Sequence, residues 1–238
     1  MSSSAIRNNG GRLGQVLSGL AVALGCVLFL GGFAWGAVDY RPYTVPTASM
    51  QPTVEPGDRI LAQRIDGSEV RRGDIVVFQD QLWGSATLVK RVVGVDGDVI
   101  SCCDKQGRML INGKPIEEIS YLLNGGPASR APFDTTVPKG QLFLLGDNRA
   151  ESLDSRVHLT GGNAGTVPRG AVRARVDATA WPLGRMGMLG RTTNFSALPG
   201  GTSQPGPLPW ITGAVIAGAV LILGGASYGP VARRLRRR

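Results

Sequence analysis

Residues 75–102 read IVVFQDQLWGSATLVKRVVGVDGDVISC and contain three short apolar runs, at 75–78, 88–95 and 99–102. These runs are rich in β-branched residues, which favour strands. Arg-Gly-Asp precedes the first run and Asp-Gly-Asp precedes the third, and both sequences form turns readily. The stretch therefore predicts three successive β-strands.

The same pattern continues towards the C-terminus. Apolar runs at 109–111 and 141–145 predict two further strands, and MLINGKPI predicts a hairpin around Asn112-Gly113. Residues 112–140 are less regular, which indicates an insertion or a pair of long loops. No stretch within 39–209 has a long helical period, so we expect one continuous, mostly β domain there.

Two neighbouring cations, Lys90 and Arg91, interrupt the apolar run at 88–95. Side chains alternate between the two faces of a strand, so Lys90 shares a face with Leu88 and Val92 while Arg91 points the other way. At least one of the cations therefore needs an unusual environment, such as a buried site. The alternative is an amphipathic edge strand whose two charged groups both reach solvent.

Two uncharged apolar stretches lie near the ends of the chain, at 16–38 and 210–229. Each is long enough to cross a hydrocarbon core of roughly 30 Å as a helix, so we expect two transmembrane helices. The first could instead be a cleaved leader, because Ala34-Trp35-Gly36 has small residues at the spacing of a cleavage site. Its length exceeds the apolar region of such leaders, which favours an uncleaved anchor.

The net charge of +9 lies mostly outside the middle of the chain. Residues 39–209 contain all 17 acidic residues and 19 of the 26 basic ones. The other seven basic residues flank the apolar stretches: they are Arg7, Arg12, Arg233, Arg234, Arg236, Arg237 and Arg238. The positive-inside rule then places both termini in the cytoplasm. A nucleic-acid arm is the alternative for the basic tail, but its position directly after a membrane span argues against it.

These features predict the domain organisation. The stretch at 192–209 is uncharged and rich in Gly, Pro, Ser and Thr, which is typical of flexible linkers. In chain order we expect a cytoplasmic N-terminus at 1–15, a transmembrane helix at 16–38, an extracytoplasmic β-rich domain at 39–191, a flexible linker at 192–209, a transmembrane helix at 210–229 and a basic cytoplasmic tail at 230–238.

The three cysteines do not form a disulfide scaffold. Cys26 lies in the first apolar stretch, while Cys102 and Cys103 are neighbours, between which a bond is sterically awkward. The outer domain must therefore fold on its own apolar core, and we expect both neighbours to be buried in or after a strand. No His/Cys cluster has metal-ligand spacing, so we expect no metal and no cofactor.

The histidine content limits the possible hydrolase chemistry. His158 is the only histidine, and a Ser-His-Asp triad would have to use it. Neither G-x-S-x-G nor H-E-x-x-H occurs. A hydrolase would therefore need another base, and lysine can serve where burial lowers its pKa. Lys90 is placed for this role.

Two further segments carry candidate chemistry. Pro46 and Pro52 bracket Thr47-Ala48-Ser49-Met50, which predicts a stiff, extended backbone that could present Ser49; taken alone, the segment could equally be a Pro-rich connector. The sequence LLGDNRAESLDSR at 144–156 concentrates charged and hydroxyl side chains around a Gly-Asp-Asn turn. Such a density of polar groups indicates an ordered network rather than a solvated loop.

Taken together, these segments resemble the type I signal peptidases, the bacterial leader peptidase family with a Ser/Lys dyad. The matching motifs are PTASMQPT, RRGDIVVF, LVKRVVGVDGD and LLGDNRAESLDSR, in the order of that family and after an N-terminal anchor. GTVPRGAVRARV and Ala180-Trp181-Pro182 fit its closing strand region, so the resemblance covers about 40–185. It implies antiparallel sheets that build a partly open barrel.

The resemblance also implies roles for matched residues. Ser49 aligns with the nucleophile and Lys90 with its general base. The hydroxyl of Thr47, where serine is common in the family, and the N–H of Ser49 would form the oxyanion hole. Ser152 would orient the lysine amine. The residues that would hold the site together by charge pairing are Asp147, Asp154 and Arg156.

The implied activity is that of a membrane-bound serine endopeptidase. It would remove N-terminal signal peptides from exported preproteins through an acyl-enzyme, with a preference for small residues at −1 and −3. Its partners would be preproteins and membrane lipid, without nucleic acid, and it would act as a monomer in the plasma membrane of a bacterium.

Three alternatives differ in what Ser49 does. A self-cleaving regulator, like the repressor proteases with a similar dyad, would use it on its own chain, but two spans and no DNA-binding motif argue against this. An anchored β domain that binds envelope partners would keep its function in Ser49→Ala. A degenerate family member would lack activity, and the intact Ser49, Lys90 and Ser152 argue against that.

Overall fold

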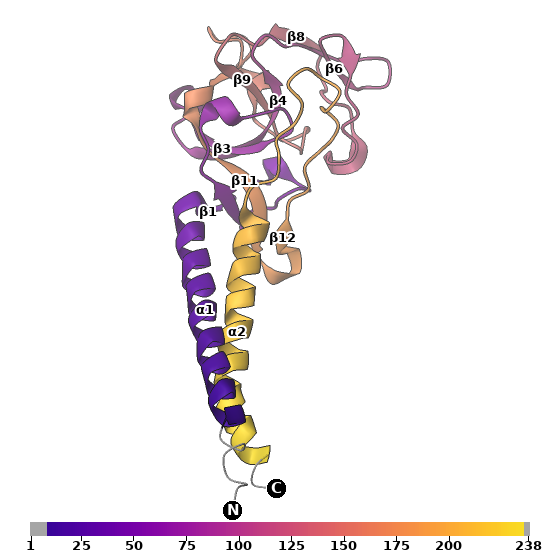
Figure 1. Ribbon diagram of the computed structural model, residues 1–238. Coiled ribbons are helices and arrows are strands. Elements are labelled where there is room, and N and C mark those ends of the chain that lie inside the picture. Colours follow the sequence, from indigo (N-terminus) through magenta and orange to yellow (C-terminus); the bar gives the residue numbers. More distant parts are fainter. Residues whose placement is uncertain (1–8, 236–238) are drawn as a thin grey trace, which may run out of the picture. The chain divides into compact units, whose positions relative to one another are not determined.

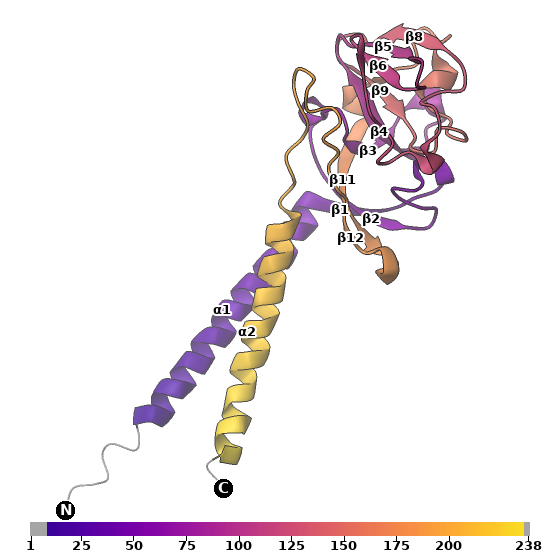
Figure 2. The ribbon, with the colours of Figure 1, turned by 90° about the vertical axis from the view of Figure 1, so that its right-hand side faces the viewer.

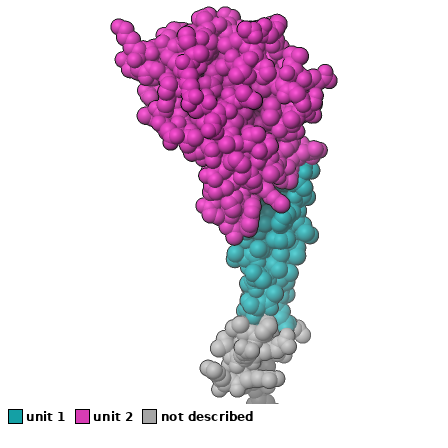
Figure 3. All heavy atoms as spheres, turned by 180° about the vertical axis from the view of Figure 1, so that it is seen from behind, with its two compact units in different colours: residues 1–39, 206–238 teal, residues 40–205 magenta. Residues whose placement is uncertain are grey.

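The computed structural model describes residues 9–235, which form two compact units (Figure 3). One unit combines Met1–Asp39 with Gly206–Arg238, and the other is Tyr40–Pro205. Parts of the expected cytoplasmic segments, residues 1–8 and 236–238, lie outside the described residues.

The first unit consists of two helices, α1 (Asn9–Asp39) and α2 (Leu208–Leu235), which pack against each other (Figure 1). Within them, Leu13–Asp39 and Leu208–Tyr228 are apolar and long enough to cross a membrane, judged by length and composition. Most of their large apolar side chains are exposed, which fits a membrane protein.

Glycines bring the two helix backbones close together. A Cβ added to Gly25 would lie 2.8 Å from the carbonyl oxygen of Gly218, and one added to Gly218 would lie 2.7 Å from that of Gly25. Two helical turns nearer the N-terminus of α1, Ser18 Oγ donates a hydrogen bond to the Gly225 carbonyl at 2.8 Å. Close approach at small residues, with a hydroxyl bonded across the interface, is a common way for membrane helices to associate.

The second unit is built mainly on a large antiparallel sheet, in the order β1-β2-β11-β3-β4-β9-β10, with β12 paired to β11. The bounds of these strands are β1 Tyr40–Thr44, β2 Arg59–Gln63, β3 Ile75–Gln79, β4 Thr87–Val95, β9 Gln141–Leu145, β10 Val167–Pro168, β11 Val172–Trp181 and β12 Gly187–Met188. Among the described residues, the end strands β1 and β10 do not pair with each other. The expected mostly β fold with a partly open barrel and a helix near each terminus is confirmed.

A small sheet lies between β4 and β9 in the chain and has the order β7-β6-β5-β8 (Figure 2). Its strands are β5 Val99–Cys102, β6 Met109–Ile111, β7 Lys114–Pro115 and β8 Phe133–Thr136. The hairpin predicted at Asn112-Gly113 joins β6 to β7, and both turn residues have positive φ, 52° and 75°. The irregular stretch at 112–140 therefore completes this sheet and its connections.

The remaining helical elements of Tyr40–Pro205 are single 3₁₀ turns. They are Ala48–Met50, Gly67–Glu69, Gln81–Trp83, Leu123–Gly125, Ser155–His158, Arg169–Ala171 and Leu183–Arg185.

Strand β4 is an internal strand of the large sheet. It pairs with β3 through residues 87–91 and with β9 through residues 91–95. Both Lys90 and Arg91 are buried, with 2% and 3% of their surfaces exposed. The alternative of an edge strand with both charges in solvent is therefore excluded.

The segment expected to be a flexible linker packs against the β unit over 192–205. Phe195 and Leu198 are buried in the core beneath the small sheet, and Arg72 donates to the Pro199 carbonyl. Ser203 Oγ donates to Asp74. The expectation was wrong for this part of the chain, because two apolar anchors among many small residues are enough to fix it.

The cysteine pair also differs from expectation. Strand β5 ends at Cys102, which is buried, whereas Cys103 follows the strand and is exposed, so the prediction that both are buried is wrong for Cys103. The structure joins the two in a disulfide between neighbouring residues.

Candidate active site

Ser49 lies on a 3₁₀ turn, Ala48–Met50, that follows β1. Thr47 and Gln51 on either side have extended backbones, so the expected extended segment is interrupted by this turn. Met50 is fully buried and anchors the turn in the core between the sheet strands. Ser49 itself is buried except for 8% of its surface, so its hydroxyl sits at the edge of the protein interior.

Lys90 reaches Ser49 from strand β4. Its Nζ donates a hydrogen bond to Ser49 Oγ at 2.6 Å. Burial lowers the pKa of Lys90 from 10.5 to about 8, although the nearby carboxylates of Asp154 and Asp147 oppose this shift. When the amine is neutral, the same contact lets Ser49 Oγ–H donate to the nitrogen lone pair.

Thr47 is a second hydroxyl beside the Ser49 side chain. Its Oγ1 lies 3.1 Å from Ser49 Oγ, within hydrogen-bond distance. A hydroxyl in this position could also donate a hydrogen bond to an oxygen on an atom bonded to Ser49 Oγ.

The structure brings Ser152 to the site without a hydrogen bond to Lys90. Its Oγ is buried and has no hydrogen-bond partner among the described residues. It lies against Gly146, where an added Cβ would contact both Ser152 and the Ser49 carbonyl oxygen. Lys90 directs its hydrogen bond to Ser49 instead.

Asp147 forms a buried ion pair with Arg91, the neighbour of Lys90. The Arg91 guanidinium donates to both carboxylate oxygens, at 2.7 and 2.6 Å, and Thr53 Oγ1 donates to one of them. Arg91 and Lys90 point to opposite faces of β4. The Arg91–Asp147 ion pair therefore holds the strand on the face opposite to the Lys90 amine.

Asp154 and Arg156 form the second ion pair of the loop. Arg156 donates to both oxygens of Asp154 at 2.8 Å, and Asp154 also accepts the Gly146 N–H at 3.1 Å. Each of the three residues expected in charge pairs lies in an ion pair in the structure, Asp154 with Arg156 and Asp147 with Arg91.

Sequence reasoning gave no role to several buried residues in and around this site. Arg91 had a visible signal, since two adjacent cations on an apolar strand require a partner. Asn148 and Arg149 lie inside a quoted motif; the Asn148 N–H donates to the Ser49 carbonyl at 3.0 Å. Glu118 and Tyr121 lie in a stretch with no regular pattern, which offered no signal.

Ser49 and Lys90 open into a cavity of about 430 Å³. Apart from these two, its lining residues are Thr47, Ala48, Leu82, Trp83, Leu88, Glu151, Leu153 and His158. His158 stacks on the Trp83 ring, with centroids 4.6 Å apart, while Ser49 Oγ contacts Lys90 and Thr47. The basic group in contact with the Ser49 hydroxyl is therefore the Lys90 amine and not the His158 imidazole.

No metal-binding group was found in the part of the chain that the structure describes, where no three His, Cys, Asp or Glu side chains cluster suitably. A hydroxyl, an amine of lowered pKa and a neighbouring donor are the kinds of group that nucleophilic attack on a carbonyl group uses.

A protein-family model described as signal peptidase, peptidase S26, matches residues 15–181 of this chain. The chain belongs to this family. Its relatives include a signal peptidase I from Leptolyngbya laminosa, 35% identical over 160 residues that cover 63% of this chain and 73% of the relative. A probable signal peptidase I from Mycobacterium leprae is 31% identical over 208 residues, and the match covers 63% of this chain and 71% of the relative.

Among solved structures, a signal peptidase I from Enterococcus faecalis shares 25% identity, with a TM-score of 0.35 over 44% of this chain and 94% of that one. The family model and the two signal peptidase I relatives show that the protein is a hydrolase of the S26 signal peptidase family, as the four sequence motifs predicted. Residues 182–205, which pack into the β unit, lie beyond the part that matches the family model.

Proposed function

We propose that the chain is a membrane-bound serine endopeptidase that removes N-terminal signal peptides from exported preproteins. The observation that carries the proposal is the 2.6 Å contact between Lys90 Nζ and Ser49 Oγ at a cavity of about 430 Å³. Ser49 is the nucleophile and Lys90 the general base. Family membership supports the substrate class, because the relatives are named as signal peptidases.

The proposed reaction has two stages. Neutral Lys90 accepts the Oγ proton as Ser49 Oγ bonds to the carbonyl carbon of the scissile peptide. The C–N bond then breaks, and the ammonium group of Lys90 donates its proton to the leaving amine. In the second stage, water attacks the acyl ester and gives a proton to Lys90, and Ser49 regains its proton as the ester bond breaks.

The oxyanion would be held by the Ser49 N–H and the Thr47 hydroxyl. The 3.1 Å distance between Thr47 Oγ1 and Ser49 Oγ supports this role. A single such donor is typically worth about 10²–10³ in rate. Ser152 would orient the amine of Lys90 by accepting a hydrogen bond from it, a role supported by its buried Oγ, which has no other partner among the described residues. Asp147, Asp154 and Arg156 hold the loop by their ion pairs.

A free strand edge supports a peptide substrate. Residues 87–90 of β4 pair with β3 on one side, but β9 pairs with β4 only from Arg91 onwards. Among the described residues, the other edge of β4 at Leu88 and Lys90 therefore has no strand partner, and both residues line the cavity. An extended peptide can add to such an edge by main-chain hydrogen bonds, with alternate side chains entering pockets.

The proposed location is the plasma membrane of a bacterium, with both termini in the cytoplasm and the β unit on the extracytoplasmic face. The two apolar helices and the basic residues next to them support this orientation. Lipid is then the surrounding partner. Action as a monomer is part of the proposal, because Ser49 and Lys90 already meet within a single chain.

The activity is tested by incubating the detergent-solubilised full chain with a model preprotein and locating the cleaved bond by mass spectrometry. We expect cleavage after the signal peptide when alanine occupies −1 and −3. A tryptophan at −1 should lower kcat/KM by about 10²-fold or more, because a bulky side chain cannot enter a pocket for small ones. Tryptophan well inside the mature region is the control. Equal cleavage of all three substrates would refute the proposed specificity.

The pKa of Lys90 predicts how the activity depends on pH. The neutral amine is the active form, so activity should fall as pH drops through the folded-state pKa of about 8. About half of the amine is neutral at pH 8 and about one tenth at pH 7. We expect the acid limb of kcat/KM to have its midpoint near pH 8 in a rate profile at constant ionic strength. A midpoint near the value of an exposed lysine would show that Lys90 is not buried in the working enzyme.

A further inference from the structure

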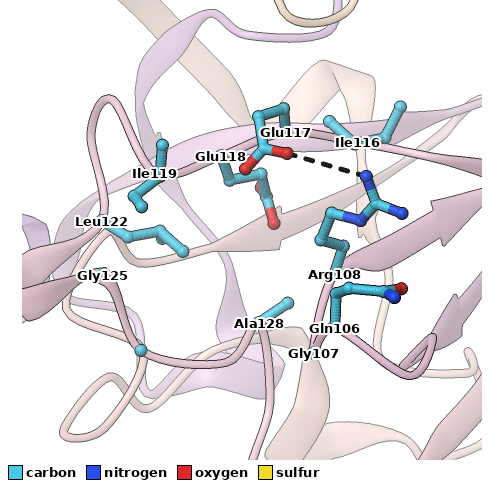
Figure 4. Close-up of a pocket in the computed structure, with 11 residues that line it drawn as sticks. Gln106, Gly107, Arg108, Ile116, Glu117, Glu118, Ile119, Leu122, Gly125 and Ala128 are labelled. Atoms are coloured by element: carbon cyan, nitrogen blue, oxygen red, sulfur yellow. Dashed lines mark ion pairs between the residues drawn. The ribbon is translucent and has the colours of Figure 1, made fainter.

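Two adjacent glutamates of the small-sheet region have opposite environments. Glu117 is 64% exposed and makes a 3.7 Å ion pair with Arg108 at the surface, which Figure 4 shows as a dashed line. Glu118 lines the same pocket, of about 90 Å³, but only 3% of its surface is exposed. A buried carboxylate with no part in the proposed chemistry needs a physical reason.

Glu118 is the centre of a buried polar cluster. Arg149 donates to both of its carboxylate oxygens, at 2.9 and 2.6 Å, and the Tyr121 hydroxyl donates to one of them at 2.5 Å. Burial lowers the pKa of Arg149, but the Glu118 carboxylate outweighs this and raises it above its ordinary value. Burial and Glu118 also raise the pKa of Tyr121, so its hydroxyl remains a donor.

Arg149 connects this cluster to the loop that supports Ser49. Its Nε donates to the Gly146 carbonyl at 2.9 Å, and its own carbonyl accepts from Arg156. Gly146 lies directly against the Ser49 carbonyl oxygen, which also accepts the Asn148 N–H. The position of the Ser49 backbone is therefore set by a loop that Arg149 holds.

A second connection reaches the strand that carries Lys90. The Arg91 guanidinium lies over the Tyr121 ring, 4.1 Å from its centroid, as in a cation–π contact. The Leu123 N–H, two residues further on, donates to the Asp147 carbonyl at 3.3 Å. The turn from Glu118 to Leu123 thus contacts both the loop behind Ser49 and the ion pair behind Lys90.

We propose that Glu118, acting through Arg149 and Tyr121, is a positioning residue that holds Ser49 and Lys90 in reactive geometry. This inference rests on the proposed roles of Ser49 and Lys90. The small-sheet region then serves the reaction by supplying Glu118, whose ion pair with Arg149 holds the loop next to Ser49. Without the carboxylate, the buried Arg149 would lose its only ionic partner among the described residues, and the Gly146 carbonyl would lose a fixed donor.

The first test is Glu118→Gln, which keeps the shape of the side chain and removes its charge. We expect kcat for preprotein cleavage to fall about 10–100-fold while KM changes by less than about threefold, as for a small misplacement of reacting groups. Glu118→Asp, which keeps the charge, should retain more activity. Glu117→Gln is the matched surface control and should equal the wild type.

A second control separates positioning from loss of stability. Asp98 and Arg72 form an equally buried ion pair away from the cavity, at 2.6 Å. Asp98→Asn should lower the melting temperature as Glu118→Gln does, but leave kcat unchanged in the folded enzyme. If both variants lower kcat alike, or if folded Glu118→Gln keeps the wild-type kcat, the proposal is refuted.

Tyr121→Phe replaces Glu118→Gln as the test if that variant fails to fold. It removes one hydroxyl and should lower kcat about threefold or more at unchanged KM. An unchanged kcat in Tyr121→Phe refutes the proposal.

Labelling of Ser49 distinguishes this inference from the proposed function. A small serine-directed acylating reagent, followed by intact mass, should modify the wild type and not Ser49→Ala. Glu118→Gln should react about 10-fold more slowly or worse, since the Oγ proton is transferred less readily. Equal labelling of wild type and Ser49→Ala would overturn the nucleophile assignment itself, whereas equal rates for wild type and Glu118→Gln would overturn only the positioning role.

Discussion

Replacing Lys90 by methionine is expected to lower kcat for preprotein cleavage by about 10³-fold or more at pH 8, because the proposed mechanism then lacks a base to accept the Ser49 proton. Ser49→Ala should have an effect of the same order, since the two side chains act as one unit through their 2.6 Å contact. The double variant should be no worse than either single one. KM should change little in each case.

The fold should survive the Lys90→Met change. Methionine has a similar length and no charge, so it removes a buried amine whose pKa is lowered by burial. We therefore expect a melting temperature equal to or above that of the wild type at pH 7. Lys114→Met, at an exposed position of β7, is the control for a lost lysine charge. If Lys90→Met retained wild-type kcat, His158 in the same cavity would become the candidate base, and His158→Ala would show it.

The strands that could be predicted are those that contain a short, mostly apolar run. The observed β5, β6 and β9 have the predicted bounds, and β3 and β4 differ by one residue at one end. Each run lies between turn-forming residues and is rich in Val, Ile and Leu, so the local pattern and the fold agree.

Strands β1 and β11 could not be predicted from the pattern alone. β1 contains Pro42, which is compatible only with an edge position, and β1 is indeed an end strand of the large sheet. In β11 the buried Arg175 and Asp177 break the apolar alternation. Their polar partners are distant in sequence, with Arg175 donating to Gln63 and Asp177 accepting from Tyr40. Only the family resemblance pointed to the β11 region.

The candidate site also contains residues that the sequence indicated and others that it did not. Ser49 and Lys90 are 41 residues apart, and no local pattern shows that they meet; the order of the family motifs did. Glu118 lies in neither a regular local pattern nor a family motif. Its partner Arg149 is 31 residues away, and the sequence around it is irregular. Such pairs depend on the path of the folded chain, which composition and periodicity do not encode.

Gly146→Ala is the other change expected to have a large effect, because it adds a single methyl group at the most crowded point of the site. The new Cβ would lie 2.5 Å from Ser152 Cβ and closer still to Ser152 Oγ and the Ser49 carbonyl oxygen. The Ser49 oxygen belongs to the backbone and cannot rotate away, so the loop or the Ser49 turn must move.

Since Ser49 must keep its contact with Lys90 to react, we expect Gly146→Ala to lower kcat about 10²-fold or more. Overpacking should also lower the free energy of unfolding by about 1–3 kcal/mol. Steady-state kinetics and thermal unfolding measure the two effects, and Gly170→Ala, where a Cβ meets nothing within 4 Å, is the matched control. The backbone of Gly146 does not have the positive φ that would add strain, so any loss comes from the contact with Ser49 and Ser152. Wild-type kcat in Gly146→Ala would mean that this loop is not held against Ser49 during catalysis. The contacts of Glu118 and Arg149 with the loop would then not determine the position of Ser49.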